Sequence, residues 1–233
     1  MINEILAAIE NRSALDIIRY VDEKFGDQVV FSTSFGIEDQ VITHLLAETK
    51  SKASLFTLDT GRLFPETYSV WNKTLSRYKL PIATYYPNTE ALQQLLTEKG
   101  PLSFYESVEN RKECCGIRKV EPLNRALKGF KVWLTGIRAE QSPNREHMLS
   151  VEWDEGHQLL KIHPLFHWSL QEVELFLKEN NVPYNALHNK GFPSIGCQPC
   201  TRAVQPGEDQ RAGRWWWEDQ SKKECGLHTT RTA

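Results

Sequence analysis

The sequence predicts an α/β fold with a parallel sheet, on two observations. Short apolar or β-branched runs alternate with stretches of helical spacing from about residue 28 to residue 135. Because parallel strands need long crossover connections, for which helices are the usual solution, this alternation favours a parallel sheet flanked by helices. The composition, with 40% apolar and 25% charged residues among 233, is that of an ordinary globular protein and supplies enough residues for a core.

The expected elements of the first half follow the chain in order. Residues 1–25 place apolar side chains three to four positions apart and predict a helical segment. The expected strands cover residues 28–31, 53–58 and 82–86. The expected helices cover residues 38–48, 64–78 and 90–96.

The second half continues the alternation and then changes character. A helix is expected over 116–127, started or broken at Pro122, and a strand over 131–135. Residues 149–153 and 158–162 predict a hairpin. A helix is expected over 169–180, with Ser169 as its N-cap and Glu172 in the capping-box position.

The expected organisation is one nucleotide-binding domain with flanking segments. Residues 1–25 form the N-terminal helical segment, 26–180 the α/β domain, and 181–233 a segment rich in loops, proline and glycine. We interpret Trp215-Trp216-Trp217, in this last segment, as core or interface rather than a surface for stacking bases.

Charge and apolar patterning limit the classes of partner. The net charge of −2 gives no overall field for nucleic acid or acidic membranes, and there is no signal-peptide pattern or membrane-spanning apolar run. We therefore expect a cytoplasmic protein that binds neither. Residues 111–145 nevertheless hold nine basic and three acidic residues, which favours a small anionic ligand, with a solvated helix face as the alternative.

A hydroxyl-rich turn follows the first predicted strand. Ser32, Thr33, Ser34 and Gly36 lie between a strand and a helix, where backbone amides and small side chains can hold an anion. Ordinary helix capping is the alternative, and the turn lacks the glycine and lysine pattern of a P-loop. Asp59-Thr60-Gly61-Arg62 occupies the equivalent place after the second strand, which raises the case for a nucleotide site.

Four of the five cysteines occur in two close pairs. Cys114-Cys115 and Cys197-Gln198-Pro199-Cys200 supply four soft ligands, suited to structural zinc or an iron–sulfur cluster. Directly adjacent ligands fit a larger cluster better than a single zinc ion, while buried thiols without a ligand are the third possibility. Cys225 is left over as a candidate nucleophile, with Gly226 leaving its sulfur open and His228 close by.

Arginines complete the candidate anion site. Arg138 and Arg145 follow the strand expected at 131–135, and Arg211 and Arg214 lie between the Cys197–Cys200 turn and the tryptophans. Guanidinium groups bind phosphate and sulfate oxygens in pairs, which is why arginine suits such a position.

Together these motifs resemble the assimilatory adenylyl-sulfate reductases, the iron–sulfur branch of the phosphoadenosine phosphosulfate reductase family. The resemblance depends on the two cysteine pairs, on Thr-Gly-Ile-Arg-x-x-Gln-Ser-x-x-Arg at 135–145 and on Glu-Cys-Gly-Leu-His at 224–228. It implies a three-layer fold similar to the adenine nucleotide alpha-hydrolases. It also implies reduction of adenosine 5′-phosphosulfate to sulfite and AMP, with thioredoxin or a glutaredoxin-like protein as electron donor, and a homo-oligomer.

The resemblance also implies roles for individual residues. A 4Fe-4S cluster would be held by Cys114, Cys115, Cys197 and Cys200. Cys225 would attack the substrate to give an S-sulfocysteine, with His228 and Lys119 as the other catalytic residues. The substrate would contact Arg118, Arg138, Arg145, Arg211, Arg214 and the turn at 32–36. Thr33 and Ser34 replace two glycines of the related pyrophosphatase loop, which fits an enzyme that releases no pyrophosphate.

Three alternatives remain open at this point. One is an enzyme for the 3′-phosphorylated substrate, or for both substrates, although the four paired cysteines favour the non-phosphorylated one. Another is an ATP-dependent RNA thiolase, which would need an intact pyrophosphate loop and a positive surface. The last is a zinc- or cluster-based redox sensor in which Cys225 has no role.

Overall fold

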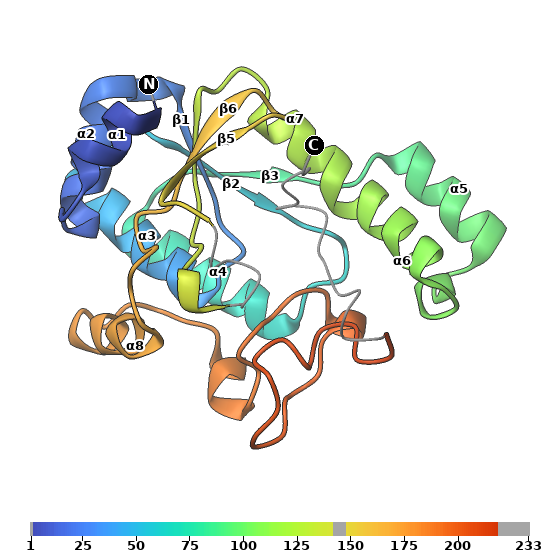
Figure 1. The fold of residues 1–233 in the computed structure, drawn as a ribbon. Helices are drawn as coiled ribbons and strands as arrows, with labels where there is room; N and C mark the ends of the chain where they lie inside the picture. The colour runs from blue at the N-terminus through green and yellow to red at the C-terminus, as the bar shows by residue number, and fades with distance from the viewer. Residues whose placement is uncertain (1, 142–147, 219–233) are drawn as a thin grey trace. The chain divides into compact units, whose positions relative to one another are not determined.

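A six-stranded sheet of order β3-β2-β1-β4-β6-β5 organises the fold (Figure 1). The computed structural model describes residues 2–141 and 148–218. The strands are β1 Val29–Ser32, β2 Ser54–Leu58, β3 Ile82–Tyr85, β4 Val132–Leu134, β5 Val151–Asp154 and β6 Leu159–Ile162. β1 pairs in parallel with β2 and β4, β4 pairs in parallel with β6, and β5 and β6 form the antiparallel hairpin. The predicted α/β fold with a mostly parallel sheet is therefore confirmed.

Helices connect the strands, as parallel pairing requires. They are α1 Ile2–Ile9, α2 Ala14–Phe25, α3 Ile37–Thr49, α4 Pro65–Tyr78, α5 Thr89–Lys99, α6 Val108–Cys115, α7 Glu121–Leu127 and α8 Leu170–Glu179. The predicted capping box is confirmed, because Ser169 accepts from the Glu172 amide and Glu172 accepts from the Ser169 amide. Such a cap stabilises a helix by about 1 kcal/mol.

The structure adds two features to the predicted helices. Residues 1–25 form two helices, because the chain turns at Asn11, which has φ of 58°, and restarts with Ser13 capping α2. The cysteine pair at 114–115 ends a helix, α6, that the sequence analysis did not place, with Ser107 as its N-cap. A π-helical turn, Gly116–Val120, joins α6 to α7, and Pro122 lies in the first turn of α7 where proline is tolerated.

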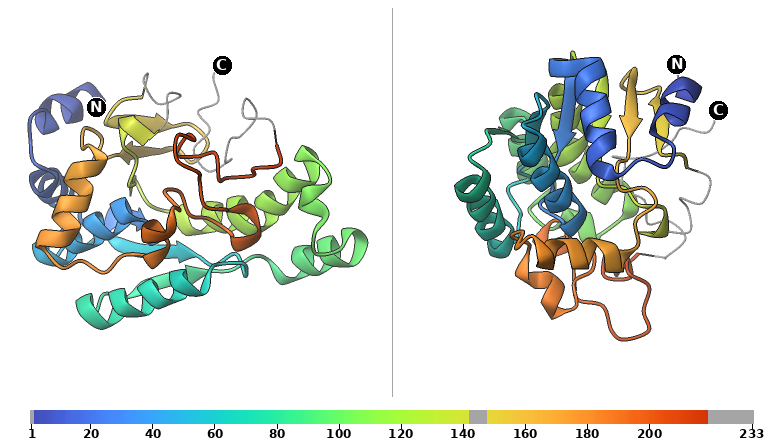
Figure 2. Two further views of the ribbon diagram at one scale, coloured as in Figure 1. Left: turned by 90° about the horizontal axis from the view of Figure 1, so that it is seen from below. Right: turned by 90° about the vertical axis from the view of Figure 1, so that its left-hand side faces the viewer.

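The main core lies between one face of the sheet and helices α1, α2, α3 and α8 (Figure 2). Buried aliphatic residues of β1, β4, β5 and β6 pack there against the apolar stripes of these helices. Within the described residues, no helix has both the length and the apolar content needed to cross a lipid bilayer.

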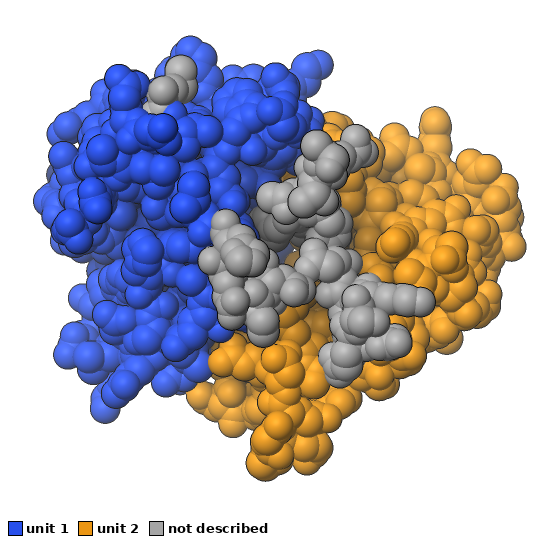
Figure 3. Space-filling view, in the orientation of Figure 1, with its two compact units in different colours: residues 1–57, 67–83, 127–185 blue, residues 58–66, 84–126, 186–233 orange. Residues whose placement is uncertain are grey.

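The described chain divides into two compact units, coloured blue and orange in Figure 3. Unit 1 comprises residues 1–57, 67–83 and 127–185, and unit 2 comprises residues 58–66, 84–126 and 186–233. The boundaries expected from the sequence, at residues 25 and 180, stay predictions.

Candidate functional site

The predicted site residues fall into two groups, one in each unit. Unit 1 holds the hydroxyl loop, which we define as residues 32–36, together with Arg138. Unit 2 holds the cysteine group, defined as Cys114, Cys115, Cys197 and Cys200, together with Arg118, Lys119, Arg211 and Arg214. Arg145, Cys225 and His228 lie outside the described residues, so their roles stay predictions.

The hydroxyl loop lies at the carboxyl end of β1, and its own contacts hold it. The Trp133 indole nitrogen donates to Ser32 Oγ at 2.8 Å. Thr33 is buried, its amide donates to the Phe56 carbonyl at 2.8 Å, and its hydroxyl accepts from the Phe35 amide. Ser34 is exposed, and Gly36 caps α3. The loop therefore presents Ser34 to solvent while the polar groups of Thr33 have partners within unit 1.

Asp39, in the first turn of α3, is a residue of this loop region that sequence analysis missed. Its carboxylate accepts from the Ser34 amide at 2.6 Å and from Ser34 Oγ at 2.7 Å. Burial raises the pKa of Asp39 from its ordinary 3.8 to about 6, against the lowering effect of these hydrogen bonds. The carboxyl group at the start of α3 therefore changes charge near pH 6 rather than near pH 4.

The chain after β4 approaches Asp39 so closely that it needs a glycine. A Cβ atom at Gly136 would lie 2.5 Å from Asp39 Oδ1, so no other residue fits without movement. Two residues later Arg138 is almost fully buried, and it donates to Glu38 at 2.9 Å and to Glu140 at 3.1 Å. Two carboxylates thus already neutralise the guanidinium that was predicted to bind substrate, and its contact with substrate stays a prediction.

Replacing Asp39 by asparagine should flatten the pH dependence of stability. Because the folded state keeps the Asp39 proton to higher pH than the unfolded state, this stabilisation is full below about pH 3.8 and is lost as pH rises through about 6. The free energy of unfolding of the wild type should thus fall relative to Asp39→Asn by on the order of 3 kcal/mol across this window. Urea unfolding on either side of the window measures it.

A matched control replaces another first-turn aspartate. Asp16 in α2 accepts from its N-cap Ser13 much as Asp39 accepts from Ser34, but its side chain is half exposed. Asp16→Asn therefore controls for the loss of a capping contact. An Asp39→Asn variant whose stability follows pH in parallel with the wild type would contradict the assignment.

Helix α6 and a turn near the C-terminus form the cysteine group. Cys114, Cys197 and Cys200 are buried in one apolar cluster with Leu95, Phe104 and Trp215. Cys115 is half-buried beside Cys114 on α6. Thr60 is 1% exposed, and its hydroxyl lies 3.2 Å from Cys197 Sγ. The fold thus brings together two cysteine pairs separated by some eighty residues of sequence.

Neighbouring charges from the cysteines and from two predicted cations act on the pKa of Cys200. Burial, and then the charges of Cys197 and Cys115, raise the pKa of Cys200 to about 12, while Lys119 and Arg214 act to lower it. The Cys200 thiol therefore does not ionise near neutral pH without a strong positive charge beside it. The described residues contain no three His, Cys, Asp or Glu side chains placed to hold a single metal ion.

Two buried arginines in unit 2 have hydrogen-bond donors that no described residue accepts from. Arg118, in the π-helical turn, donates to the Thr60 carbonyl, and Arg214 donates to Ser194 Oγ at 3.3 Å and lies over the Trp215 ring. The Nε atoms of both arginines are buried without a hydrogen-bond partner among the described residues. Neither arginine forms an ion pair with a described carboxylate, in contrast to Arg138. Lys119 is half-buried on the same turn, and Arg211 is half-buried one turn before Arg214.

The Asp59–Arg62 turn, which follows β2, contacts the loop that carries Cys197 and Cys200. Asp59 accepts from the Gly61 amide at 2.8 Å, and Gly61 has φ of 69°. The Arg62 carbonyl accepts from the Gln198 amide at 2.8 Å, and its guanidinium lies over the Phe104 ring. The turn therefore holds the Cys197–Cys200 loop, a function that its sequence did not reveal.

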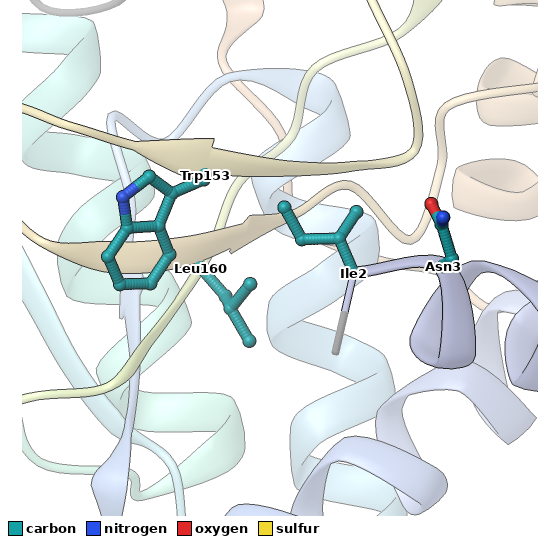
Figure 4. Close-up of a pocket in the computed structure, with 4 residues that line it drawn as sticks. All are labelled: Ile2, Asn3, Trp153 and Leu160. Carbon is teal, nitrogen blue, oxygen red and sulfur yellow. The ribbon is translucent and has the colours of Figure 1, made fainter.

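A cavity of about 400 Å³ lies elsewhere, at the edge of the sheet in unit 1. It is lined by Trp153 and Leu160 from the β5–β6 hairpin and by Ile2 and Asn3 from α1 (Figure 4). These lining residues include no charged group and no thiol. Its chemistry does not match the anion site predicted from the sequence.

The chain is similar to known proteins over most of its length. The phosphoadenosine phosphosulfate reductase domain model matches residues 28–203. The adenosine 5′-phosphosulfate reductase of Allochromatium vinosum is 47% identical over 216 residues, which cover 93% of this chain and 84% of the relative. The enzyme of the same name from Burkholderia cepacia is 45% identical over 227 residues, which cover 97% and 90%.

Solved structures place the fold in the same group. The phosphoadenylyl-sulfate reductase of Candida auris, solved as a phosphate complex, matches with a TM-score of 0.75 and 29% identity over 87% of this chain and 96% of that one. An FMN adenylyltransferase of Candida glabrata matches with a TM-score of 0.57 and 18% identity over 95% and 77%, and that likeness concerns the fold alone. The chain thus belongs to the phosphoadenosine phosphosulfate reductase domain family.

Proposed function

We propose that this chain reduces adenosine 5′-phosphosulfate to sulfite and AMP, with Cys225 as nucleophile and a thioredoxin as electron donor. Its similarity to the adenosine 5′-phosphosulfate reductases extends over nearly the whole chain, so the protein is an oxidoreductase of sulfate assimilation. The observation that carries the proposal is the cysteine group with two buried guanidinium groups, Arg118 and Arg214, in the same unit.

The arginines supply what a phosphosulfate needs. Its sulfur is surrounded by anionic oxygens, so a thiolate can approach only where cations neutralise them. Arg118 and Arg214 each have a buried Nε–H that can donate to such an oxygen, and burial strengthens the interaction. We assign Lys119 and Arg211 to the same anion, and Ser32, Thr33, Ser34, Gly36, Arg138 and Arg145 to the nucleotide.

The cysteine group fits a 4Fe-4S cluster held by Cys114, Cys115, Cys197 and Cys200. The donor set is four sulfurs, the ligand type that iron–sulfur clusters take, and three of them are shielded from water by apolar neighbours. An iron–sulfur cluster offers each of the four thiolates a separate iron. When bound, the cluster supplies the cationic iron that keeps buried thiols such as Cys200 deprotonated.

The reaction needs only one further cysteine from this chain. In the first step a bond forms between Cys225 Sγ and the substrate sulfur, the sulfur–oxygen bond to AMP breaks, and AMP leaves with that electron pair. In the second step a thioredoxin thiolate attacks Cys225 Sγ and sulfite leaves with the electron pair of the sulfur–sulfur bond. The second thioredoxin thiol then releases the Cys225 thiolate and closes the thioredoxin disulfide. We assign His228 to the binding of the developing negative charge.

The cellular setting follows from this chemistry. A catalytic thiolate, an iron–sulfur cluster and a thioredoxin-type donor all require reducing conditions, which suits the cytoplasm. A glutaredoxin-like donor would perform the same exchange. Assembly into a homo-oligomer stays a prediction from the resemblance, and light scattering on the purified protein measures it.

An anaerobic assay tests the proposed function. With reduced thioredoxin, the iron-containing protein should release sulfite and AMP from adenosine 5′-phosphosulfate in equal amounts. Its kcat/KM should be at least about tenfold higher for this substrate than for the 3′-phosphorylated one, because a site without a partner for the extra phosphate leaves that charge unpaired. Absence of turnover with both nucleotides would reject the proposal.

The second candidate function is reduction of the 3′-phosphorylated nucleotide. The family description and the Candida auris reductase both name that substrate. The same assay separates the two functions, because a higher kcat/KM for the 3′-phosphorylated substrate would replace the first proposal by the second.

A further inference from the structure

Arg111 of α6 links a predicted cluster ligand to the last described residue of the chain. Its Nε and Nη2 atoms donate to the two carboxylate oxygens of Glu218 at 2.9 and 2.8 Å. Its guanidinium also forms a side-chain hydrogen bond with Cys115. Both charged side chains are buried, with exposed fractions of 2% for Arg111 and 3% for Glu218. The contact is therefore a bidentate ion pair shielded from water, with a sulfur as its third partner.

The helix geometry explains how one arginine reaches both partners. Arg111 and Cys115 are four residues apart on α6 and so lie on one face of the helix. The Trp215 ring packs against the Arg111 guanidinium, 4.7 Å from its centroid, and Arg214 also lies over this ring, at 5.0 Å. Trp215 therefore contacts two guanidinium groups, and the planar fork of Arg111 is held in one orientation.

A second contact connects the same segment to the other cysteine pair. The Trp215 amide donates to the Cys200 carbonyl at 3.2 Å, and the Glu218 amide donates to the Trp215 carbonyl at 2.9 Å. The turn 215–218 is thus attached to Cys200 through its backbone and to Cys115 through Arg111. Both cysteine pairs contribute to holding one short turn.

This turn lies directly before the segment that carries the proposed nucleophile. Cys225 follows Glu218 by seven residues, which span at most about 25 Å when fully extended. Any displacement of Glu218 therefore changes the volume that Cys225 can reach. Orientation of a nucleophile to within about an ångström has large effects on rate.

We propose that Arg111 is a positioning residue that fastens the start of the C-terminal segment, at Glu218, to the cysteine group, and so sets the origin from which Cys225 reaches the substrate. The proposal rests on the assignment of Cys225 as nucleophile. It assigns the cysteine group a mechanical role in catalysis that requires no electron transfer. Loosening of Cys115 would act on Glu218 through Arg111, which contacts both residues.

The test measures the first half-reaction separately from binding and from cluster content. The full-length, iron-containing protein is mixed anaerobically with adenosine 5′-phosphosulfate in the absence of thioredoxin, and S-sulfonation of Cys225 is followed by mass spectrometry. Glu218→Ala should slow sulfonation at least tenfold, and Glu218→Gln, which keeps a hydrogen-bond acceptor, should slow it less. Iron content and the dissociation constant for AMP should match the wild type in both variants.

The Arg202–Glu208 pair offers a matched control in the same unit. It is also bidentate, at 2.8 Å and 2.8 Å, but both side chains are about one third exposed. Glu208→Ala should leave the sulfonation rate unchanged. If the ion pair only stabilised the fold, Glu218→Gln would melt at a lower temperature but would keep the wild-type sulfonation rate below that temperature. An unchanged rate of this kind would contradict the positioning role.

Two results separate the possible failures. Sulfonation of Glu218→Gln and Glu218→Ala at the wild-type rate would overturn the role of Arg111 and leave the proposed function intact. Wild-type protein that turns over substrate but never carries an S-sulfonated Cys225 would overturn the nucleophile assignment, and with it this inference.

Discussion

Replacement of Cys225 by serine should abolish sulfite release while the protein keeps its iron and its affinity for AMP. A serine hydroxyl is not ionised near neutral pH, whereas a thiolate is both ionised and strongly nucleophilic toward sulfur. Removal of a covalent nucleophile costs on the order of 10⁴-fold or more in rate. Sulfite release with reduced thioredoxin under anaerobic conditions measures the loss.

A second variant shows which atom is responsible. Cys225→Ala should be as inactive as Cys225→Ser, since neither provides a thiolate. Neither variant should form the S-sulfonated protein or lose the brown absorbance of the cluster, because the four proposed ligands remain. Turnover of Cys225→Ser close to that of the wild type would show that another group attacks the substrate.

Cys114→Ser should lose iron and activity together. Cys114 is buried in the apolar cluster with Cys197 and Cys200, so a serine there leaves one iron without its thiolate and places a hydroxyl among apolar side chains. If the serine hydroxyl makes α6 move outward, the π-helical turn that follows α6 and carries Arg118 and Lys119 moves with it. Iron per chain, the visible spectrum and sulfite release are measured on the same anaerobic preparation.

Thr60→Val is the matched control for that change. Thr60 is buried and contacts Cys197 Sγ, but it is not one of the four proposed ligands. Valine keeps its shape and removes only the hydroxyl, so iron content should stay near that of the wild type. A Cys114→Ser protein with full activity and no iron would break the proposed dependence of the reaction on the cluster.

The elements of the fold were predictable because their signals are local. The apolar runs that became β1, β2, β3 and β4 and the capping box at Ser169 each depend on neighbours within a few residues. Two features escaped the sequence analysis, the break between α1 and α2 and the helix α6, and both have local causes. Asn11 takes a left-handed conformation that its identity permits but does not require, and α6 has almost no apolar stripe by which periodicity could reveal it.

The two cysteine pairs were recognisable for a similar reason. Ligand chemistry limits which residues can hold a cluster, so the spacing of four cysteines indicates a shared site without knowledge of the fold. The structure adds the burial of three sulfurs and the proximity of Lys119 and Arg214 to Cys200. Burial and charge of this kind arise only when distant segments pack together.

Asp39 and Arg111 mark the limit of what local pattern could show. Asp39 is one of many acidic residues at helix starts, and only its burial beside Ser34 and Gly136 raises its pKa to about 6. Arg111 forms an ion pair with Glu218, which is 107 residues away in the sequence, and no local pattern indicates such a partner.

The sequence by itself determined the fold class, and it predicted the four-cysteine ligand set and the surplus thiol, because periodicity and ligand type are properties of residues near one another in the chain. Only the tertiary structure decided which of the predicted cations are neutralised by carboxylates. Arg138 is paired with carboxylates, while the Nε atoms of Arg118 and Arg214 have no hydrogen-bond partner among the described residues. This difference depends on what each side chain packs against once water is excluded.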